Sequence, residues 1–152
     1  MGYVLHAVLA HAGMMTLEGK ALEVSELVGL PQGFELLPVT DELLDLWGGE
    51  GVFTQAFEGL NTGLLERLER WSGRGRVAYL EIETWAGVDE HRAAAVWEAT
   101  QLIYGPEKCG GNYEVTNAAL RLLGVQTAHG PTLDEFEALE LHRKRHTSNW
   151  LG

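Results

Sequence analysis

The glutamates Glu81 and Glu83 are the residues whose type and spacing best suit them for chemistry. They lie in the run from Val77 to Trp85, which we interpret as a β-strand. Because alternate side chains of a strand share one face, the two carboxyl groups are expected side by side, about 6.5–7 Å apart. Carboxyl pairs at such separations work as acid and base, and aromatic neighbours can raise one of the two pKa values by desolvation. The alternative interpretation is the wet face of an antiparallel sheet.

A second polar group, Asp89-Glu90-His91, follows this strand and is expected in a turn from Gly87 to His91. Loops carry functional residues more often than strands do. A histidine beside carboxylates can act as a base or join them as a metal ligand. Together with the two strand glutamates, His91 would form the candidate catalytic set of a small hydrolase. The alternative interpretation is an exposed polar hairpin turn.

Two aromatic residues, Tyr79 and Trp85, are expected on the same strand face as the glutamates. Aromatic side chains often dominate the energetics of protein interfaces, whereas charges at the rim mainly set the association rate. The same region therefore also predicts a protein-binding surface. Its candidate residues are Tyr79, Glu81, Glu83, Trp85, Asp89 and Glu90.

The remaining histidines and the cysteine do not predict a cofactor. His142 and His146 are four residues apart, but three cationic residues lie between them. His6 and His11 differ by an odd number of residues and would face opposite sides of one strand. Cys109 is the only cysteine, and no partner for a nucleophile is evident beside it. We therefore expect no tightly bound metal and no cofactor.

Hydrophobic periodicity and turn residues predict the elements that must position these side chains. Strands are expected at 3–10 and 34–39, with three more folded back on one another within 76–105, and helices at about 41–47, 52–71 with a break near Asn61, 113–123 and 132–142. A glycine-bearing loop is expected at 105–111. Strands and helices are grouped rather than alternating, which predicts an α+β fold with a mostly antiparallel sheet packed by helices on one face. The length of 152 residues predicts one domain, residues 1–152.

The charge of the chain limits its partners. There are 22 Asp and Glu residues against 11 Lys and Arg, which gives a net charge of −11. Such an acidic surface repels phosphate backbones and anionic lipids, so we expect neither nucleic-acid nor membrane binding. The charge suits a basic protein partner, and the alternative is that it serves solubility. The oligomeric state stays open.

The sequence also predicts a cytoplasmic location. A single cysteine cannot form an intrachain disulfide, which fits a reducing compartment. The first residues lack the basic segment of a signal peptide, and no apolar run approaches the ~20 residues that a membrane-spanning helix needs.

Several runs of the chain resemble a group of small bacterial single-domain proteins with no established activity. They are 78–81, 87–90, 93–97, 117–124 and 146–150. The resemblance implies a bacterial, soluble, single-domain protein and transfers no functional residues. The acidity of the chain, the strand face with Tyr79 and Trp85 and the lack of a convincing catalytic set instead lead us to expect a non-catalytic protein-binding module, such as an inhibitor or immunity-type protein. The alternative is a small hydrolase that uses Glu81, Glu83 and His91.

Overall fold

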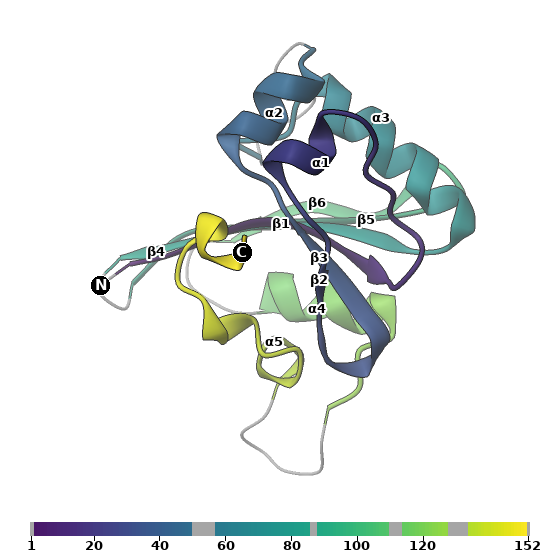
Figure 1. The fold of residues 1–152 in the computed structure, drawn as a ribbon. Helices are drawn as coiled ribbons and strands as arrows, with labels where there is room; N and C mark the ends of the chain where they lie inside the picture. Colours follow the sequence, from purple (N-terminus) through teal and green to yellow (C-terminus); the bar gives the residue numbers. More distant parts are fainter. Residues whose placement is uncertain (1, 50–56, 86–87, 110–113, 128–133, 152) are drawn as a thin grey trace.

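The framework of the protein is a six-stranded antiparallel sheet, in the order β2-β3-β1-β4-β5-β6 (Figure 1). The computed structural model describes residues 2–49, 57–85, 88–109, 114–127 and 134–151, without the side chains at 85, 88–90, 108 and 109. The strands are β1 (Tyr3–His11), β2 (Val28–Gly29), β3 (Phe34–Pro38), β4 (Val77–Trp85), β5 (Val88–Glu98) and β6 (Gln101–Cys109).

The helices of the described part are mostly short. The α-helices are α1 (Ala21–Val24), α2 (Asp41–Trp47), α3 (Thr62–Trp71), α4 (Glu114–Leu123) and α5 (Glu135–Ala138). The 3-10 turns are η1 (Pro31–Gly33), η2 (Ser72–Arg74), η3 (Leu141–Arg143) and η4 (Thr147–Trp150). None of these helices is long and apolar enough to cross a membrane.

The predicted α+β class and the antiparallel sheet are confirmed, but helices cover both faces of the sheet rather than one. Figure 1 shows α1, α2 and α3 on one side, and α4 and α5 on the other. Two separate cores result, because both sets of alternating side chains in the central strands are largely apolar. In β4, Ala78, Leu80 and Ile82 belong to the core under α4, whereas Val77 and Tyr79 belong to the core under α3.

Several local predictions are also confirmed. Thr40 caps α2, since its hydroxyl oxygen accepts a hydrogen bond from the Leu43 N–H at 3.3 Å. The expected break near Asn61 is the start of α3, where the Asn61 side chain accepts from the Leu64 N–H at 2.8 Å. The predicted pairing of 93–98 with the preceding strand is present, with Trp97 opposite Val77.

Two predicted loops are wrong, because their residues pair with neighbouring strands. Asp89, Glu90 and His91 lie in β5, not in a turn, with Asp89 opposite Thr84 and His91 opposite Glu83. The loop predicted at 105–111 is strand β6 as far as Cys109, and the rest of that loop lies outside the described residues. Backbone pairing in a sheet overrides the weak strand propensity of Asp, Glu, Gly and Pro.

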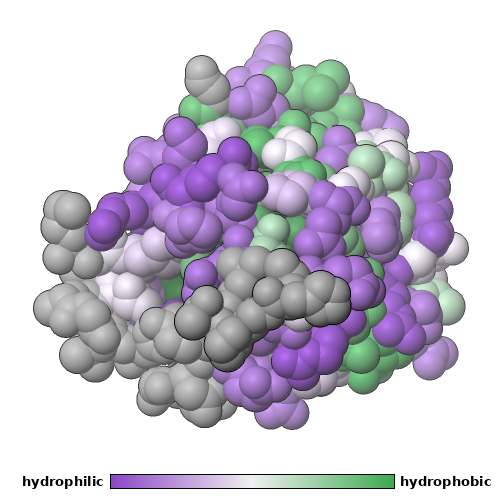
Figure 2. Space-filling view, turned by 90° about the horizontal axis from the view of Figure 1, so that it is seen from below, coloured by the Kyte–Doolittle hydropathy of each residue, from purple (hydrophilic) through white to green (hydrophobic). Residues whose placement is uncertain are grey.

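The last predicted helix is shorter than expected. It ends at Ala138, and Asp134 caps it by accepting from the Glu137 N–H, while the expected cap, Thr132, lies outside the described residues. Figure 2 views the molecule from the side of α4 and α5. On the described part of this face, hydrophilic residues predominate and hydrophobic ones form small separate groups, as expected for an acidic chain.

Candidate functional site

A cluster of histidine and glutamate side chains interrupts the apolar face of the sheet that packs against α3. Three adjacent strands build it. His6 of β1 lies opposite Glu81 of β4, and Glu83 of β4 lies opposite His91 of β5. Side chains at directly opposed positions of an antiparallel pair share a face and stand close together. The strand order therefore gathers four ionisable groups, His6 from β1, Glu81 and Glu83 from β4, and His91 from β5.

Glu81 is the centre of this cluster and is fully buried. Its carboxylate accepts four hydrogen bonds. The Tyr79 hydroxyl donates to Oε2 at 2.6 Å, and His91 Nε2 contacts Oε1 at 2.9 Å. The backbone N–H groups of Glu58 and Gly59 donate to Oε1 and Oε2, each at 2.8 Å. A buried carboxylate needs hydrogen bonds in place of its lost hydration, and Glu81 has four such contacts.

The segment 57–60 is held over the cluster by its own apolar residues. Phe57 and Leu60 are buried in the core, and the Phe57 ring packs edge-on against Tyr79 with 5.0 Å between ring centroids. Gly59 permits the close approach, because a Cβ there would lie 3.2 Å from His6 Nδ1 and 3.4 Å from a Glu81 oxygen. The segment thus delivers both its N–H groups to Glu81 and the Glu58 side chain to the cluster.

The surroundings of Glu81 favour its ionised form. Burial raises the pKa of Glu81, whereas the nearby His6 and the hydrogen bonds from Tyr79, Glu58 and His91 lower it, and the net pKa lies below the usual value. Burial also raises the pKa of Tyr79 well above its usual value, so this hydroxyl stays a donor. The buried side of the cluster is therefore an anchored carboxylate with its donors in place.

His91 is held by this carboxylate. Its side chain is buried, and with Nε2 bound to Glu81 its other ring nitrogen, Nδ1, is a buried atom that has no hydrogen-bond partner among the described residues. A carboxylate on one ring nitrogen fixes the orientation of an imidazole and leaves the second nitrogen available. His91 and Glu81 are thus a rigid pair behind the more accessible residues.

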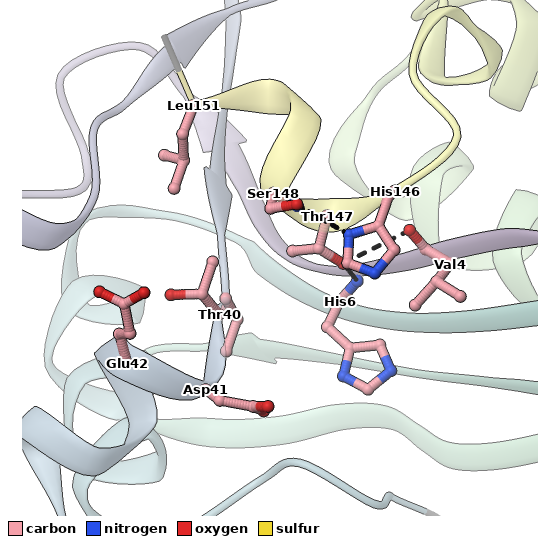
Figure 3. Close-up of a pocket in the computed structure, with 10 residues that line it drawn as sticks. Val4, His6, Thr40, Asp41, Glu42, His146, Thr147, Ser148 and Leu151 are labelled. Carbon is pink, nitrogen blue, oxygen red and sulfur yellow. Dashed lines mark hydrogen bonds between the residues drawn. The ribbon is translucent and has the colours of Figure 1, made fainter.

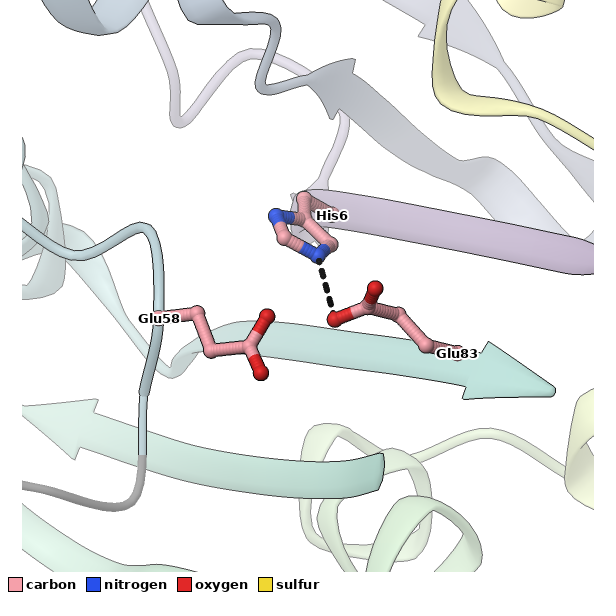
Figure 4. A group of neighbouring side chains, drawn as sticks. All are labelled: His6, Glu58 and Glu83. Carbon is pink, nitrogen blue, oxygen red and sulfur yellow. Dashed lines mark ion pairs between the residues drawn. The ribbon is translucent and has the colours of Figure 1, made fainter. Parts of the chain in front are cut away.

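The solvent side of the cluster consists of His6, Glu58 and Glu83 (Figure 4). One ligand atom from each of these residues lies within 4.8 Å of the others, so the three could hold a metal ion. His6 Nε2 and Glu83 Oε2 face each other at 3.7 Å, which is too long for a hydrogen bond. Glu58 is exposed, and the other two side chains are partly buried.

The electrostatics of these three residues are unusual. A hydrogen bond that the protonated Glu58 carboxyl group donates to Glu83, together with burial and the charge of Glu83, raises the pKa of Glu58. Burial lowers the pKa of His6, although the Glu81 and Glu58 carboxylates oppose this effect. The lowered pKa favours the neutral imidazole, in which a nitrogen lone pair can act as a base or a ligand.

A pocket of about 330 Å³ adjoins the cluster through His6 (Figure 3). One wall is the β3–α2 junction with Thr40 and Asp41, and another is η4 with Thr147 and Ser148. The Thr147 hydroxyl accepts from the His6 backbone N–H at 3.0 Å, so the same segment shapes the pocket and fixes His6. The pocket is of the size that small-molecule sites have.

The structure brings together some of the predicted site residues and separates others. Tyr79, Glu81, Glu83 and His91 meet in the cluster. The expected wet face is wrong for Tyr79 and Glu81, because both are fully buried under the segment 57–60. The side chains of Trp85, Asp89 and Glu90 lie outside the described part of the chain, so their predicted binding role stays a prediction.

Two residues of the cluster, His6 and Glu58, are absent from the sequence-based set. Strand alternation places His6 on the same face as Val8 and Ala10, but the sequence contains no signal that β1 pairs with β4. Glu58 lies in a non-helical segment just before the cap of α3, where no motif marks it.

Comparisons with known proteins add no family to this picture. No family model, curated protein or solved structure matches the chain.

Proposed function

We propose that this protein is a small hydrolase whose active centre is the solvent side of the histidine–glutamate cluster. The observation that carries the proposal is the close approach of Glu58, Glu83 and His6, whose ligand atoms lie within 4.8 Å of one another, beside a pocket that His6 lines. A carboxyl group whose pKa is raised by its neighbours can act as the acid of a hydrolytic enzyme, with a second carboxylate as the base.

The roles of the residues follow from their accessibility. Glu58 is exposed and has a raised pKa, so it suits the proton donor, while Glu83 suits the base. Glu81 is saturated with hydrogen bonds and fully buried, so it positions His91 and the segment 57–60 instead of reacting. The hydrolase proposed here thus keeps Glu83 from the sequence-based set, moves Glu81 and His91 to positioning roles, and adds Glu58.

A panel of chromogenic substrates tests the proposal, namely p-nitrophenyl esters, phosphates and glycosides and aminoacyl p-nitroanilides. We expect hydrolysis of one class, and Glu83→Gln and Glu58→Gln should each reduce it about 10²-fold or more, as loss of a general acid or base does. Glu66→Gln is the control, because Glu66 forms only an exposed ion pair with Arg70 on α3. The proposal fails if no class is hydrolysed, or if folded Glu83→Gln retains full activity.

The protein-binding module expected from the sequence is a second proposal. Its support is the net charge of −11, which suits a basic partner of an inhibitor or immunity-type protein. Burial of Tyr79 and Glu81 removes two of its expected contacts. Trp85→Ala separates the two proposals, since it should weaken a protein complex and leave hydrolysis unchanged. Both proposals assume the cytoplasmic setting expected from the sequence.

A further inference from the structure

We propose that His6, Glu58 and Glu83 bind a divalent cation of borderline softness, such as zinc or manganese. One imidazole nitrogen and two carboxylates are a donor set that such ions accept. Binding can be measured whether or not the protein is a hydrolase, and only the catalytic role of the cation rests on the proposed function.

The spacing of the donor atoms fits an ion between them. The donor atoms of the three residues lie within 4.8 Å of one another, and His6 Nε2 is 3.7 Å from Glu83 Oε2. Around a tetrahedral zinc ion with bonds of about 2.0–2.1 Å, neighbouring donors are about 3.4 Å apart. Small rotations of the carboxylates would therefore complete the site without movement of the strands.

Two of these atoms form a long ion pair with each other but make no hydrogen bond among the described residues. His6 Nε2 and Glu83 Oε2 are buried atoms with no hydrogen bond among the described residues, although they face each other. Buried polar atoms are nearly always paired, and an exception requires an explanation such as an unoccupied ion site. A cation between His6 Nε2 and Glu83 Oε2 would satisfy both lone pairs at once.

The residues around the three ligands hold them in place. The His6 backbone is fixed on both sides, because its N–H donates to the Thr147 hydroxyl and its carbonyl accepts from the Val39 N–H at 2.8 Å. The Glu58 backbone is fixed by Glu81 Oε1. Such outer contacts orient metal ligands and raise affinity. The expectation of no metal came from histidine spacing, which cannot reveal ligands from three separate segments.

Three protein ligands leave a coordination position open for water, as in catalytic zinc sites. A cation there lowers the pKa of bound water. The resulting hydroxide oxygen forms a bond to the electrophilic carbon or phosphorus, the bond to the leaving group breaks, and the proton released by the water ends on the leaving group. Glu58 and Glu83 would then be ligands, whereas in the metal-free reaction they are acid and base.

Calorimetric titration of the chelator-treated protein with zinc chloride and with manganese chloride tests the site. We expect about one ion per chain, with affinity reduced about tenfold or more in His6→Gln and in Glu83→Gln. His11→Gln is the matched control, because His11 lies on the same strand and is exposed, stacking on Phe34. Absence of binding, or binding that His6→Gln and Glu83→Gln leave unchanged, overturns the inference.

A measurement on the unaltered protein covers the case in which a variant does not fold. In long-range ¹H–¹⁵N spectra, zinc should shift the ring nitrogens of His6 and leave those of His11 in place, and the reverse result rejects the site. Hydrolysis assayed with a chelator keeps the two proposals apart. Binding without hydrolysis contradicts the proposed function alone, and hydrolysis unaffected by chelator in a protein that binds no ion contradicts the metal site alone.

Discussion

Glu81 organises the candidate site from a position that no substrate can reach. A fully buried carboxylate needs compensation for lost hydration, and its four hydrogen bonds come from β4, β5 and the segment 57–60. The two carboxylate oxygens of Glu81 hold all four of these partners in place. The residue that looked most like a catalyst in the sequence therefore acts through Glu58 and His91, which it places.

The stability effect of Glu81→Gln follows from this arrangement. An amide retains one acceptor oxygen and presents an NH₂ group to the remaining donors, so buried donors are left unpaired. We expect a loss of about 3–5 kcal/mol in the free energy of unfolding, as for breaking a buried pair. Glu83→Gln, two residues along the same strand, should change it by less than about 1 kcal/mol, because Glu83 is partly exposed and its ion pair with His6 is long, at 3.7 Å. Urea unfolding of both variants decides this, and equal effects would contradict the account.

The lowered pKa of Glu81 has a consequence for pH dependence. Since the folded-state pKa lies below the usual 4.5, this group stabilises the fold fully above pH 4.5 and loses that contribution as pH falls through the folded value. The difference in unfolding free energy between the unaltered protein and Glu81→Gln should thus be constant above pH 4.5 and shrink below it. Chelator-treated protein should be used for the urea titrations. A difference that grows on acidification would reverse the assigned direction of the shift.

At the scale of elements, the loop-helix segment around Asn61 depends on close packing of α2 and α3. A Cβ at Gly63 would lie 2.5 Å from the Trp47 carbonyl oxygen and 2.6 Å from that of Gly48. The Gly63 N–H also donates to the Gly48 carbonyl at 3.0 Å. The helix that follows Glu58 is thereby docked onto the end of α2.

Gly63→Ala should therefore destabilise the protein by about 1–3 kcal/mol, as overpacking does. Gly73→Ala is the control, since a Cβ at Gly73 meets no atom within 4 Å. Thermal unfolding of the two variants is the measurement. If Gly63→Ala is as stable as Gly73→Ala, the two helices do not approach as closely as described.

Local signals explain which elements could be predicted. Helix ends depend on the chemistry of single residues. The side chains of Thr40 and Asn61 cap helix starts, and Gly124 ends a helix with a positive φ, so the local sequence is enough to predict these boundaries. Strand pairing is different. β1 lies between β3 and β4, and its own sequence does not indicate that these two strands are its neighbours. The site follows the same division, because Glu81 and Glu83 share one strand, whereas His6 reaches them only through that pairing.

At the scale of the whole molecule, the helices on both faces explain how the cluster can be buried and still have an accessible side. α2, α3 and the segment 57–60 cover Glu81, while the pocket beside His6 and the exposed Glu58 keep the other side open. The prediction of helices on one face would have left this surface wet. Because the second face is covered, Glu81 is buried, whereas Glu83 and Glu58 remain at least partly accessible to solvent.

Anomalous X-ray diffraction at the zinc edge, on crystals grown with zinc, would locate an ion bound by His6, Glu58 and Glu83. The account predicts a peak between His6 Nε2, Glu83 Oε2 and the Glu58 carboxylate, at about 2.0–2.2 Å from each. A peak found only at other histidines, such as His142 or His146, would contradict it. So would a crystal without a peak in which His6 Nε2 and Glu83 Oε2 still face each other unpaired.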